Sequence, residues 1–270
     1  MYLFWQNYAP PSVLVELGGW SVHWYGLILV LAILSAYFYV RSRMIKKSVL
    51  SRAQVDDLFF YVIIGGLVGS RLGHVLFYNF SYYWREPQDI VKVWQGGLSI
   101  HGALLLAFLV LWWWSRKHQV SFWQLTDYLA PAVALGQAIG RWGNYFNQEL
   151  YGRPSDSWWA IYIEPAKRVA GYEYYDLFMP AFFLESLLNL ILFFILFRLS
   201  TEKNLNKGLL TGFYLLGYSL IRFFMEFIRI DPTPLVLGWR LPQLISLIIL
   251  GLSVLIIFYL YKKPNSSGQY

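Results

Sequence analysis

The sequence predicts an all-α polytopic membrane protein, and its composition supports this fold class in two ways. Hydrophobic residues make up 57% of the 270 residues, charged residues only 14%, and the mean hydropathy is +0.44. Soluble globular chains carry roughly 25% charged residues, so a soluble fold would lack the polar side chains to cover its surface. Aromatic residues reach 20%, with 13 Trp and 21 Tyr, side chains that favour the membrane–water boundary.

Hydropathy along the chain predicts about seven transmembrane helices. A spanning helix needs about 20 mostly apolar residues. Seven stretches qualify, at roughly 20–40, 58–78, 98–114, 122–140, 179–199, 208–228 and 241–261. The third stretch is short and the fourth contains Asp127 and Pro131, so these two are the weakest members of the set.

The distribution of Lys and Arg predicts the orientation. Twelve of these residues fall in loops on one side of the predicted spans and seven on the other. Because short cytoplasmic loops are enriched in Lys and Arg, we expect the N-terminus outside and the C-terminus in the cytoplasm.

The predicted spans divide the chain into three parts. Residues 1–146 would hold an interfacial N-terminal segment and helices 1–4, residues 147–178 an outer segment, and residues 179–270 helices 5–7 with a cytoplasmic tail. The outer segment contains many Trp and Tyr residues among scattered charges. It is either a packed loop or a small head that meets a partner at the membrane surface.

Several function classes are disfavoured by composition. The net charge is +7, but the basic residues form short separate clusters, which argues against a nucleic-acid partner. The chain has no cysteine and four scattered histidines, so it offers neither a thiol nucleophile nor a recognisable metal-ligand cluster. We therefore expect no metal and no cofactor.

Three arginines lie in or at the ends of predicted spans: Arg71, Arg141 and Arg222. A charged side chain at mid-membrane costs about 2.5–3.5 kcal/mol on insertion scales, and such residues usually face a cavity or a partner. Guanidinium groups present a planar fork suited to phosphate or carboxylate. The arginines therefore either converge on an anion site or pair with acids to tie helices together.

The sixth span carries a polar ridge on an otherwise apolar helix. Tyr218, Arg222 and Glu226 are spaced by four residues and so share one helix face. His101, at the start of the third span, stands among small residues that permit close approach of a backbone or a ligand. For both features a functional and a purely structural interpretation remain open.

The densest polar stretch is residues 140–153, GRWGNYFNQELYGR. It follows an apolar span and contains two arginines, two asparagines and Glu149 among three glycines. Asn and Arg side chains with exposed backbone amides can together hold a phosphate ester. A loop that merely ends a helix would need only one glycine, so this cluster favours a functional site.

At these residues the chain closely resembles bacterial prolipoprotein diacylglyceryl transferases. The stretch 140–153 is similar to that family's signature. Further matching motifs lie at residues 23–26, 69–73, 77–79, 96–102 and 218–226. Two positions depart from the family's usual small residues: Ala103 follows the third-helix motif where a second Gly is usual, and Gln148 stands where a Gly or another small residue is common.

The resemblance implies an enzyme of the bacterial inner membrane whose active site faces the periplasm. Such enzymes move the diacylglyceryl group of phosphatidylglycerol to the lipobox cysteine of a preprolipoprotein, forming a thioether and releasing glycerol phosphate. The partners would be these two substrates and the bilayer. The alternative left open by composition alone is a transporter for an anionic solute or lipid.

The resemblance also implies residue roles. Arg141 and Arg222 are the first candidates for the phosphate, and His101 for the base that takes the thiol proton or for a positioner of the lipid head group. Glu226 would orient an arginine or transfer a proton. The positions expected to bind substrate are Tyr25, Arg71, Asn144, Glu149, Gly152 and Tyr218.

Overall fold

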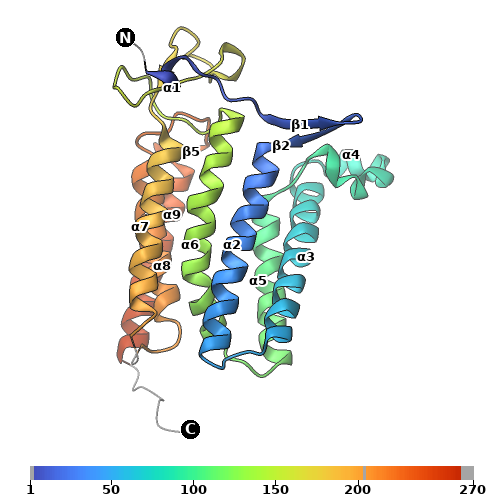
Figure 1. Cartoon of the computed structure of the whole chain (residues 1–270), viewed down its shortest axis with the longest axis vertical. Helices are drawn as coiled ribbons and strands as arrows, with labels where there is room; N and C mark the ends of the chain where they lie inside the picture. Colours follow the sequence, from blue (N-terminus) through green and yellow to red (C-terminus); the bar gives the residue numbers. More distant parts are fainter. Residues whose placement is uncertain (1–2, 203–204, 263–270) are drawn as a thin grey trace. The chain divides into compact units, whose positions relative to one another are not determined.

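The structure, a computed structural model, describes residues 3–202 and 205–262. The predicted cytoplasmic tail beyond residue 262 lies outside the described residues. Seven long helices carry the fold (Figure 1). They are α2 (Trp24–Lys46), α3 (Arg52–Phe77), α5 (Ile100–Lys117), α6 (Phe122–Asn147), α7 (Ala181–Leu199), α8 (Leu209–Met225) and α9 (Leu241–Lys262). Each coincides with one of the seven predicted apolar stretches.

The remaining elements are short. Two short helices are α1 (Phe4–Asn7) and α4 (Phe80–Arg85), and three 3₁₀ turns follow at Pro87–Val91, Val93–Gln95 and Pro165–Lys167. Three antiparallel pairs of strands are β1 (Val13–Leu17) with β2 (Trp20–His23), β3 (Ile161–Tyr162) with β4 (Leu177–Phe178), and β5 (Leu235–Val236) with β6 (Trp239–Arg240). The chain is mostly helical, as the sequence predicts, and these small hairpins are additions to the helices.

The first helix begins later than the apolar stretch predicted. Residues 20–23 form strand β2, and α2 starts only at Trp24. Gly18 and Gly19 adopt φ values of +53° and +90°, which glycine tolerates without steric cost. They close a tight turn, so Val15 pairs with Val22 across the hairpin. The first four residues of the predicted stretch, Trp20 to His23, thus join a β-ladder and leave the helix.

The helices have the exposure pattern of a membrane protein. On α9, Ile248 and Leu255 are 62% and 65% exposed, whereas Ser246 and Ser253 are buried. Each buried serine hydroxyl donates to a backbone carbonyl of its own helix. Apolar side chains on the outside and hydrogen-bonded polar side chains on the inside are the reverse of the pattern in a soluble protein. This arrangement suits a helix surrounded by lipid.

Length and hydropathy support several spans. Among the described residues, α2, α3, α7 and α9 are long and apolar enough to cross a membrane, and α8 is a shorter apolar helix. Helices α5 and α6, which correspond to the two weakest predicted stretches, are not in this group. The chain is a polytopic membrane protein.

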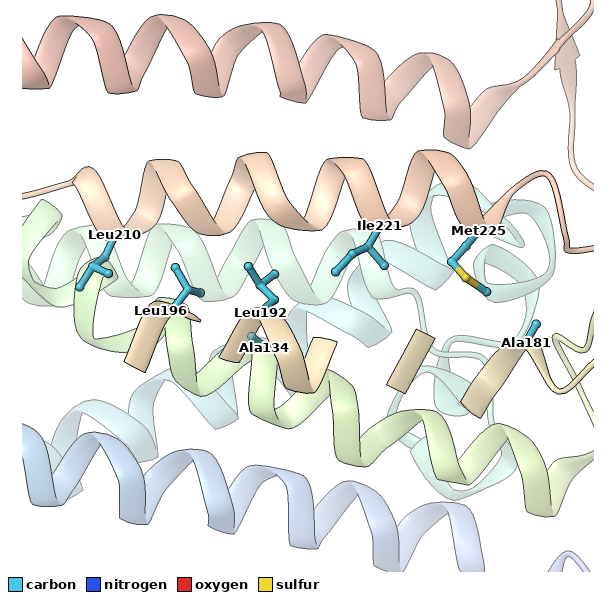
Figure 2. Packing of buried hydrophobic residues seen from close by; sticks show 7 residues of the cluster. All are labelled: Ala134, Ala181, Leu192, Leu196, Leu210, Ile221 and Met225. Carbon is cyan, nitrogen blue, oxygen red and sulfur yellow. The ribbon is translucent and has the colours of Figure 1, made fainter. Parts of the chain in front are cut away.

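The chain divides into two compact units, residues 1–39 with 126–270 and residues 40–125. In the first unit, α8 packs against both α7 and α9. A buried apolar cluster holds α6, α7 and α8 together (Figure 2). Its members are Ala134, Ala181, Leu192, Leu196, Leu210, Ile221 and Met225.

In the second unit, α3 and α5 approach each other through glycines. The backbones of Gly69 and Gly102 touch, and a Cβ atom at Gly73 would lie 2.8 Å from the Cα of Gly102. Small residues of this kind let transmembrane helices pack backbone to backbone. The small residues around His101 thus serve the α3–α5 contact.

Asp127, an unfavourable residue in a predicted span, caps another helix. Its carboxylate accepts hydrogen bonds from the backbone N–H of Gly208 at 2.6 Å and of Thr211 at 2.8 Å, and from the Thr211 hydroxyl at 2.7 Å. These amides belong to the first turn of α8, where N–H groups lack partners within the helix. Asp127 therefore joins the start of α6 to the start of α8.

Candidate active site

Four arginines and three carboxylates form one connected cluster in the first unit. We call this the arginine cluster; it consists of Arg141, Glu185, Arg222, Glu226, Arg229, Asp231 and Arg240. The members come from the C-terminal part of α6, the start of α7, the end of α8, the segment after α8, and β6. Five segments of the chain thus deliver charged groups to one place.

Glu226 occupies the centre of the arginine cluster. Its buried carboxylate pairs through Oε1 with Arg222 Nη1 at 2.5 Å and through Oε2 with Arg240 Nε at 2.5 Å. A third arginine, Arg229, approaches Oε1 to 3.9 Å. Both oxygens face guanidinium groups, but only Oε2 accepts a hydrogen bond, from Arg240. Oε1 contacts Arg222 as an ion pair without hydrogen-bond geometry.

Glu185 connects the α6 arginine to the same cluster. Its side chain is 2% exposed, and Oε1 accepts a hydrogen bond from Arg141 Nη2. Its other oxygen lies 3.7 Å from Arg229 Nη1. Glu185 is the only acid of α7, a mostly apolar helix, and a buried lone carboxylate of this kind requires cationic partners.

The charges of the arginine cluster do not cancel. Burial alone would raise the pKa of Asp231, but the hydrogen bond from Arg229 and the charges of Arg229, Arg240 and Arg222 lower it below the usual value for an Asp. With its carboxylates ionised, the cluster has four guanidinium groups against three carboxylates. One positive charge is left over within this set of seven ion-paired residues.

Three of the arginines can be reached from outside the cluster. The side chains of Arg141, Arg222 and Arg240 are 20%, 16% and 21% exposed, whereas Arg229 is 5% exposed. Arg229 is tied down by a 2.7 Å bond to Asp231. The predicted phosphate-binding pair is thus accessible, together with Arg240, and Arg229 is the buried arginine of the cluster.

Asn144 and Glu149 extend the site along the polar stretch. Arg141 Nη1 donates to Asn144 Oδ1 at 3.4 Å, and Asn144 Nδ2 donates to Glu149 Oε1 at 2.9 Å. Glu149 therefore holds the asparagine amide so that its oxygen faces Arg141. The stretch differs from the prediction in one respect: α6 continues to Asn147, six residues past Arg141, so Arg141 and Asn144 lie one turn apart on a helix.

The turn after α6 explains the departure at Gln148. This residue has φ = +53°, a conformation that favours glycine. Its buried side chain accepts a hydrogen bond from the backbone N–H of Glu164 at 2.7 Å. The side-chain contact offsets the backbone cost and fastens the turn to the segment that follows.

Tyr25 lies over the same turn of α6. A Cβ atom at Gly143 would come within 2.6 Å of Tyr25 Cδ2, so only glycine allows the ring to lie against the helix backbone there. The Tyr25 side chain remains 41% exposed. The Tyr25 ring therefore lies against Gly143, which stands between Arg141 and Asn144 in the sequence, and the side chain is open to a ligand.

Gly152 has a packing role at the edge of the cluster. Its backbone pairs with that of Arg229, and a Cβ atom would lie 2.8 Å from Ile228 Cγ2. Arg153 N–H also donates to Ile228 O at 3.0 Å. Gly152 thus allows the stretch 140–153 to lie directly on the segment that carries Arg229.

Tyr218 lies in α8, one turn before Arg222. Its ring stacks on Tyr214 at a centroid distance of 5.9 Å, and Tyr214 donates to Gln137 Oε1 at 3.2 Å. The predicted polar ridge is therefore present, with Arg222 and Glu226 joined as an ion pair and Tyr218 held by aromatic stacking.

The structure places Arg71 in a different environment, within the second unit. All five of its N–H donors contact backbone carbonyls. These carbonyls belong to Asp89, Ile90, Lys92, Gly96 and Gly97. Its guanidinium also lies 5.0 Å from the centroid of the Tyr83 ring. Arg71 thus organises the loop between α4 and α5 and has no donor to spare for a phosphate.

His101 also lies in the second unit, in the first turn of α5. Its side chain is exposed, and within the described part of the chain it forms no hydrogen bond or ion pair. The next residue, Gly102, contacts α3. His101 is thus carried on a firmly packed helix end and is open to a substrate.

Sequence reasoning missed four members of the arginine cluster: Glu185, Arg229, Asp231 and Arg240. Arg229 and Arg240 were counted only as charges of outer loops, and Asp231 lies beside Arg229 in the segment after α8. Glu185 could have been found, because a single acid inside an apolar stretch is itself a signal for a buried partner. Among the described residues, no group of three or more His, Cys, Asp or Glu could hold a metal ion.

Comparison with known proteins gives the family. A family model described as prolipoprotein diacylglyceryl transferase matches residues 12–259. The phosphatidylglycerol–prolipoprotein diacylglyceryl transferase of Synechococcus elongatus is 38% identical over 96% of this chain and 90% of its own length. Those of Synechocystis and Acaryochloris marina are each 36% identical, over 96% and 98% of this chain and 93% and 96% of their own lengths. The chain therefore belongs to the prolipoprotein diacylglyceryl transferase family.

Proposed function

We propose that this protein transfers the diacylglyceryl group of phosphatidylglycerol to a cysteine thiol of a prolipoprotein. The observation that supports this most directly is the arginine cluster, a buried set of ion pairs with one positive charge left over in a member of this family. In the reaction, a bond forms between the cysteine sulfur and the glyceryl carbon. The carbon–oxygen bond to phosphate breaks, glycerol phosphate leaves with the bonding electron pair, and the thiol loses its proton.

Arg141 and Arg222 stabilise the departing phosphate in this proposal. Negative charge on the phosphate oxygens grows as the carbon–oxygen bond breaks, and fixed cations in a site shielded from water favour that change. Glu185 and Glu226 hold the two guanidinium groups in place before substrate binds, so little reorganisation is needed during the reaction. Tyr25 and Asn144, beside Arg141, are placed to contact the glycerol hydroxyls or the phosphate.

In this proposal Glu226 does not accept the proton of the cysteine thiol. Both oxygens of Glu226 are paired with arginines, and a proton there would break an ion pair. His101, exposed and without an ion pair among the described residues, remains the candidate that accepts the thiol proton or positions the lipid head group. The thiolate is the stronger nucleophile, so removal of this proton speeds the attack.

For the topology, we propose seven spans in the inner membrane of a bacterial cell. The N-terminus, the arginine cluster and residues 147–178 would lie on the outer, periplasmic side, and the C-terminus in the cytoplasm. The excess of Lys and Arg on the other side supports this orientation. Because the chain has no native cysteine, a Ser155→Cys variant can be labelled at one site. Labelling only after the inner membrane is permeabilised would contradict the proposal.

The function is tested by incubating the purified protein with phosphatidylglycerol and a lipobox peptide. Mass spectrometry should show a gain equal to one diacylglyceryl group on the cysteine, with release of glycerol phosphate. The same peptide with Ser in place of the cysteine is the matched control and should gain nothing. Absence of transfer, together with anion flux in proteoliposomes, would support the transporter alternative instead.

A further inference from the structure

A polar cavity of about 780 Å³ opens in the segment between α6 and α7. We call it the head pocket. It is lined by Gln6, Asn7, Pro154, Ser155, Asp156, Tyr162, Tyr172, Tyr174, Tyr175, Asp176 and Leu177. None of these residues belongs to the arginine cluster, so the reaction proposed above does not explain why four tyrosines and two acids surround this cavity.

The walls of the head pocket are fixed by a small core of their own. Buried Tyr151, Ile161, Ile163, Phe178 and Phe182 pack beneath it. Helix α1, near the N-terminus, supplies another part of the wall and is hydrogen-bonded to residues 157 and 158. Trp5 Nε1 donates to Trp158 O at 3.0 Å, and Gln6 Nε2 donates to Ser157 O at 3.2 Å. A cavity whose walls come from distant segments and are hydrogen-bonded together is preorganised for a ligand.

The chemistry of the head pocket suits a polar, cationic ligand. Tyr174 is 95% exposed and Tyr175 is 51% exposed, and tyrosine faces attract cations. Asp176 is already paired with Arg168 at 2.7 Å. Asp156 is exposed and, in the part of the chain that the structure describes, forms no ion pair or hydrogen bond. Its carboxylate is available to a basic side chain.

Backbone pairing links the head pocket to the arginine cluster. Ser155 N–H donates to Leu177 O at 3.1 Å, both residues lining the pocket, and Gly152 N–H donates to Met179 O at 2.9 Å. Gly152 in turn pairs with Arg229. Three residues of extended chain separate Ser155 from Gly152, and at roughly 3.3 Å per residue this is about 10 Å. An extended polypeptide that reacts at the cluster would reach the pocket with a residue three to five positions away.

We propose that the head pocket binds the polar part of the prolipoprotein on the C-terminal side of the acceptor cysteine and prefers a basic residue about four positions after it. This inference rests on the proposed function. A polar pocket on the outer segment suits the part of the precursor that leaves the membrane; the apolar part that precedes the cysteine would contact lipid. The contact sets substrate preference and takes no part in bond breaking.

The test uses the full-length enzyme, phosphatidylglycerol and three lipobox peptides that carry Lys, Ser or Glu at the fourth residue after the cysteine. We expect KM for the Lys peptide to be about fivefold lower than for the Glu peptide, the size of effect that one exposed ion pair gives, with similar kcat. In Asp156→Asn this difference in KM should disappear. Transfer to the peptide with Ser at the fourth residue after the cysteine (the Ser peptide) should stay unchanged. Tyr174→Ala should raise KM for the Lys peptide most.

Two controls locate the effect. Glu164→Gln removes another exposed carboxylate of the same segment that does not line the head pocket, and it should keep the preference for Lys. Peptides with the same substitutions about ten residues after the cysteine, roughly 33 Å away in extended chain and beyond the head pocket, should show no preference.

Three results would overturn the inference. The first is equal KM values for the three peptides with the wild-type enzyme. The second is a loss of transfer in Asp156→Asn that is equal for all three peptides. The third is a preference for the Lys peptide that survives in that variant. In each case transfer to the Ser peptide by the wild-type enzyme shows that the proposed function still stands. Absence of transfer to every peptide would instead remove the proposed function and this inference together.

Discussion

Arg240 donates from Nε to Glu226 Oε2 at 2.5 Å, although 14 residues of chain separate them. Arg240 ends the β5–β6 hairpin, and its other nitrogens donate to the carbonyls of Arg229 and Asp231. One side chain thus fastens both the carboxylate that orients Arg222 and the backbone that carries Arg229. Arg240 is therefore a positioning residue of the arginine cluster.

The first prediction concerns this pair. Arg240→Ala should leave one Glu226 oxygen without its partner and lower kcat by about one to two orders of magnitude, since truncation of one member of a buried ion pair is costly. Glu226→Gln should have an effect of similar size. Because the two residues contact each other, the double variant should lose much less than the sum of the two single losses. Strict additivity in thioether formation would show that the two side chains act independently.

The second prediction concerns Lys replacements in the accessible pair. Arg141 uses one guanidinium nitrogen for Glu185 and the other for Asn144, an arrangement that an ammonium group cannot reproduce. Arg141→Lys and Arg222→Lys should each reduce thioether formation by about two orders of magnitude, normalised to folded protein. Arg153→Lys, at an exposed arginine of the same stretch, is the control and should remain active. Near-wild-type rates for the first two variants would contradict the phosphate assignment.

The third prediction concerns Arg71. From the sequence, Arg71 is a candidate substrate-binding residue. In the structure its donors contact five backbone carbonyls, and one ammonium group cannot replace that set of hydrogen bonds. Arg71→Lys should loosen residues 86–99 and expose them to a protease, at a cost of about 3 kcal/mol. Protection equal to that of the wild type in limited proteolysis would contradict this role.

The fourth prediction concerns the cap on α8. Asp127→Ala removes the acceptor for two backbone amides and one hydroxyl and should lower the stability of the folded protein by about 2 kcal/mol. Asp127 lies 14 residues before Arg141 on α6, about 20 Å along the helix at 1.5 Å per residue, so specific activity at low temperature should be retained. Thermal inactivation should be compared with that of Asp56→Asn, a change in a half-exposed pair with Arg41. Equal inactivation of the two variants would argue against the cap.

The fifth prediction concerns pH. The pKa of Asp231 is lowered in the folded protein, in spite of burial, by Arg229 and its neighbours. A carboxyl group of this kind stabilises the fold above its unfolded pKa of about 3.9, and the contribution is lost as pH falls through the lower folded value. The wild type should therefore lose thermal stability on acidification below about pH 4, and Asp231→Asn should lose less over the same range. Parallel pH profiles would show that Asp231 is not responsible.

The sequence predicted contacts within one helix better than contacts between segments. Arg222 and Glu226 are spaced by four residues, and helical geometry alone brings them together. The contacts of Glu185 with Arg141 and of Arg240 with Glu226 depend on how α6, α7 and the β5–β6 hairpin pack, and no periodicity encodes that. Similarly, Arg71 was recognised as a cation within a predicted span, but its partners are backbone carbonyls of an irregular loop. Every residue carries such a carbonyl, so the sequence does not indicate which ones Arg71 contacts.

The helices themselves followed from apolar length, because a bilayer imposes it. The hairpins at residues 13–23 and 235–240 were missed because each is very short. In the first, a pair of glycines outweighs the apolar composition that suggested a helix.

The contact between Asp127 and α8 has a consequence for how the protein is made. Gly208 is synthesised 81 residues after Asp127, so on the proposed topology the carboxylate enters the bilayer before the amides that satisfy it exist. Until α8 follows, α6 carries an unbonded charge that costs about 2.5–3.5 kcal/mol on insertion scales. Arrival of α8 supplies the missing donors and fixes α6 in place. Membrane assembly of this chain is therefore completed from its C-terminal half, and a nascent chain that stops before residue 208 should hold α6 only loosely.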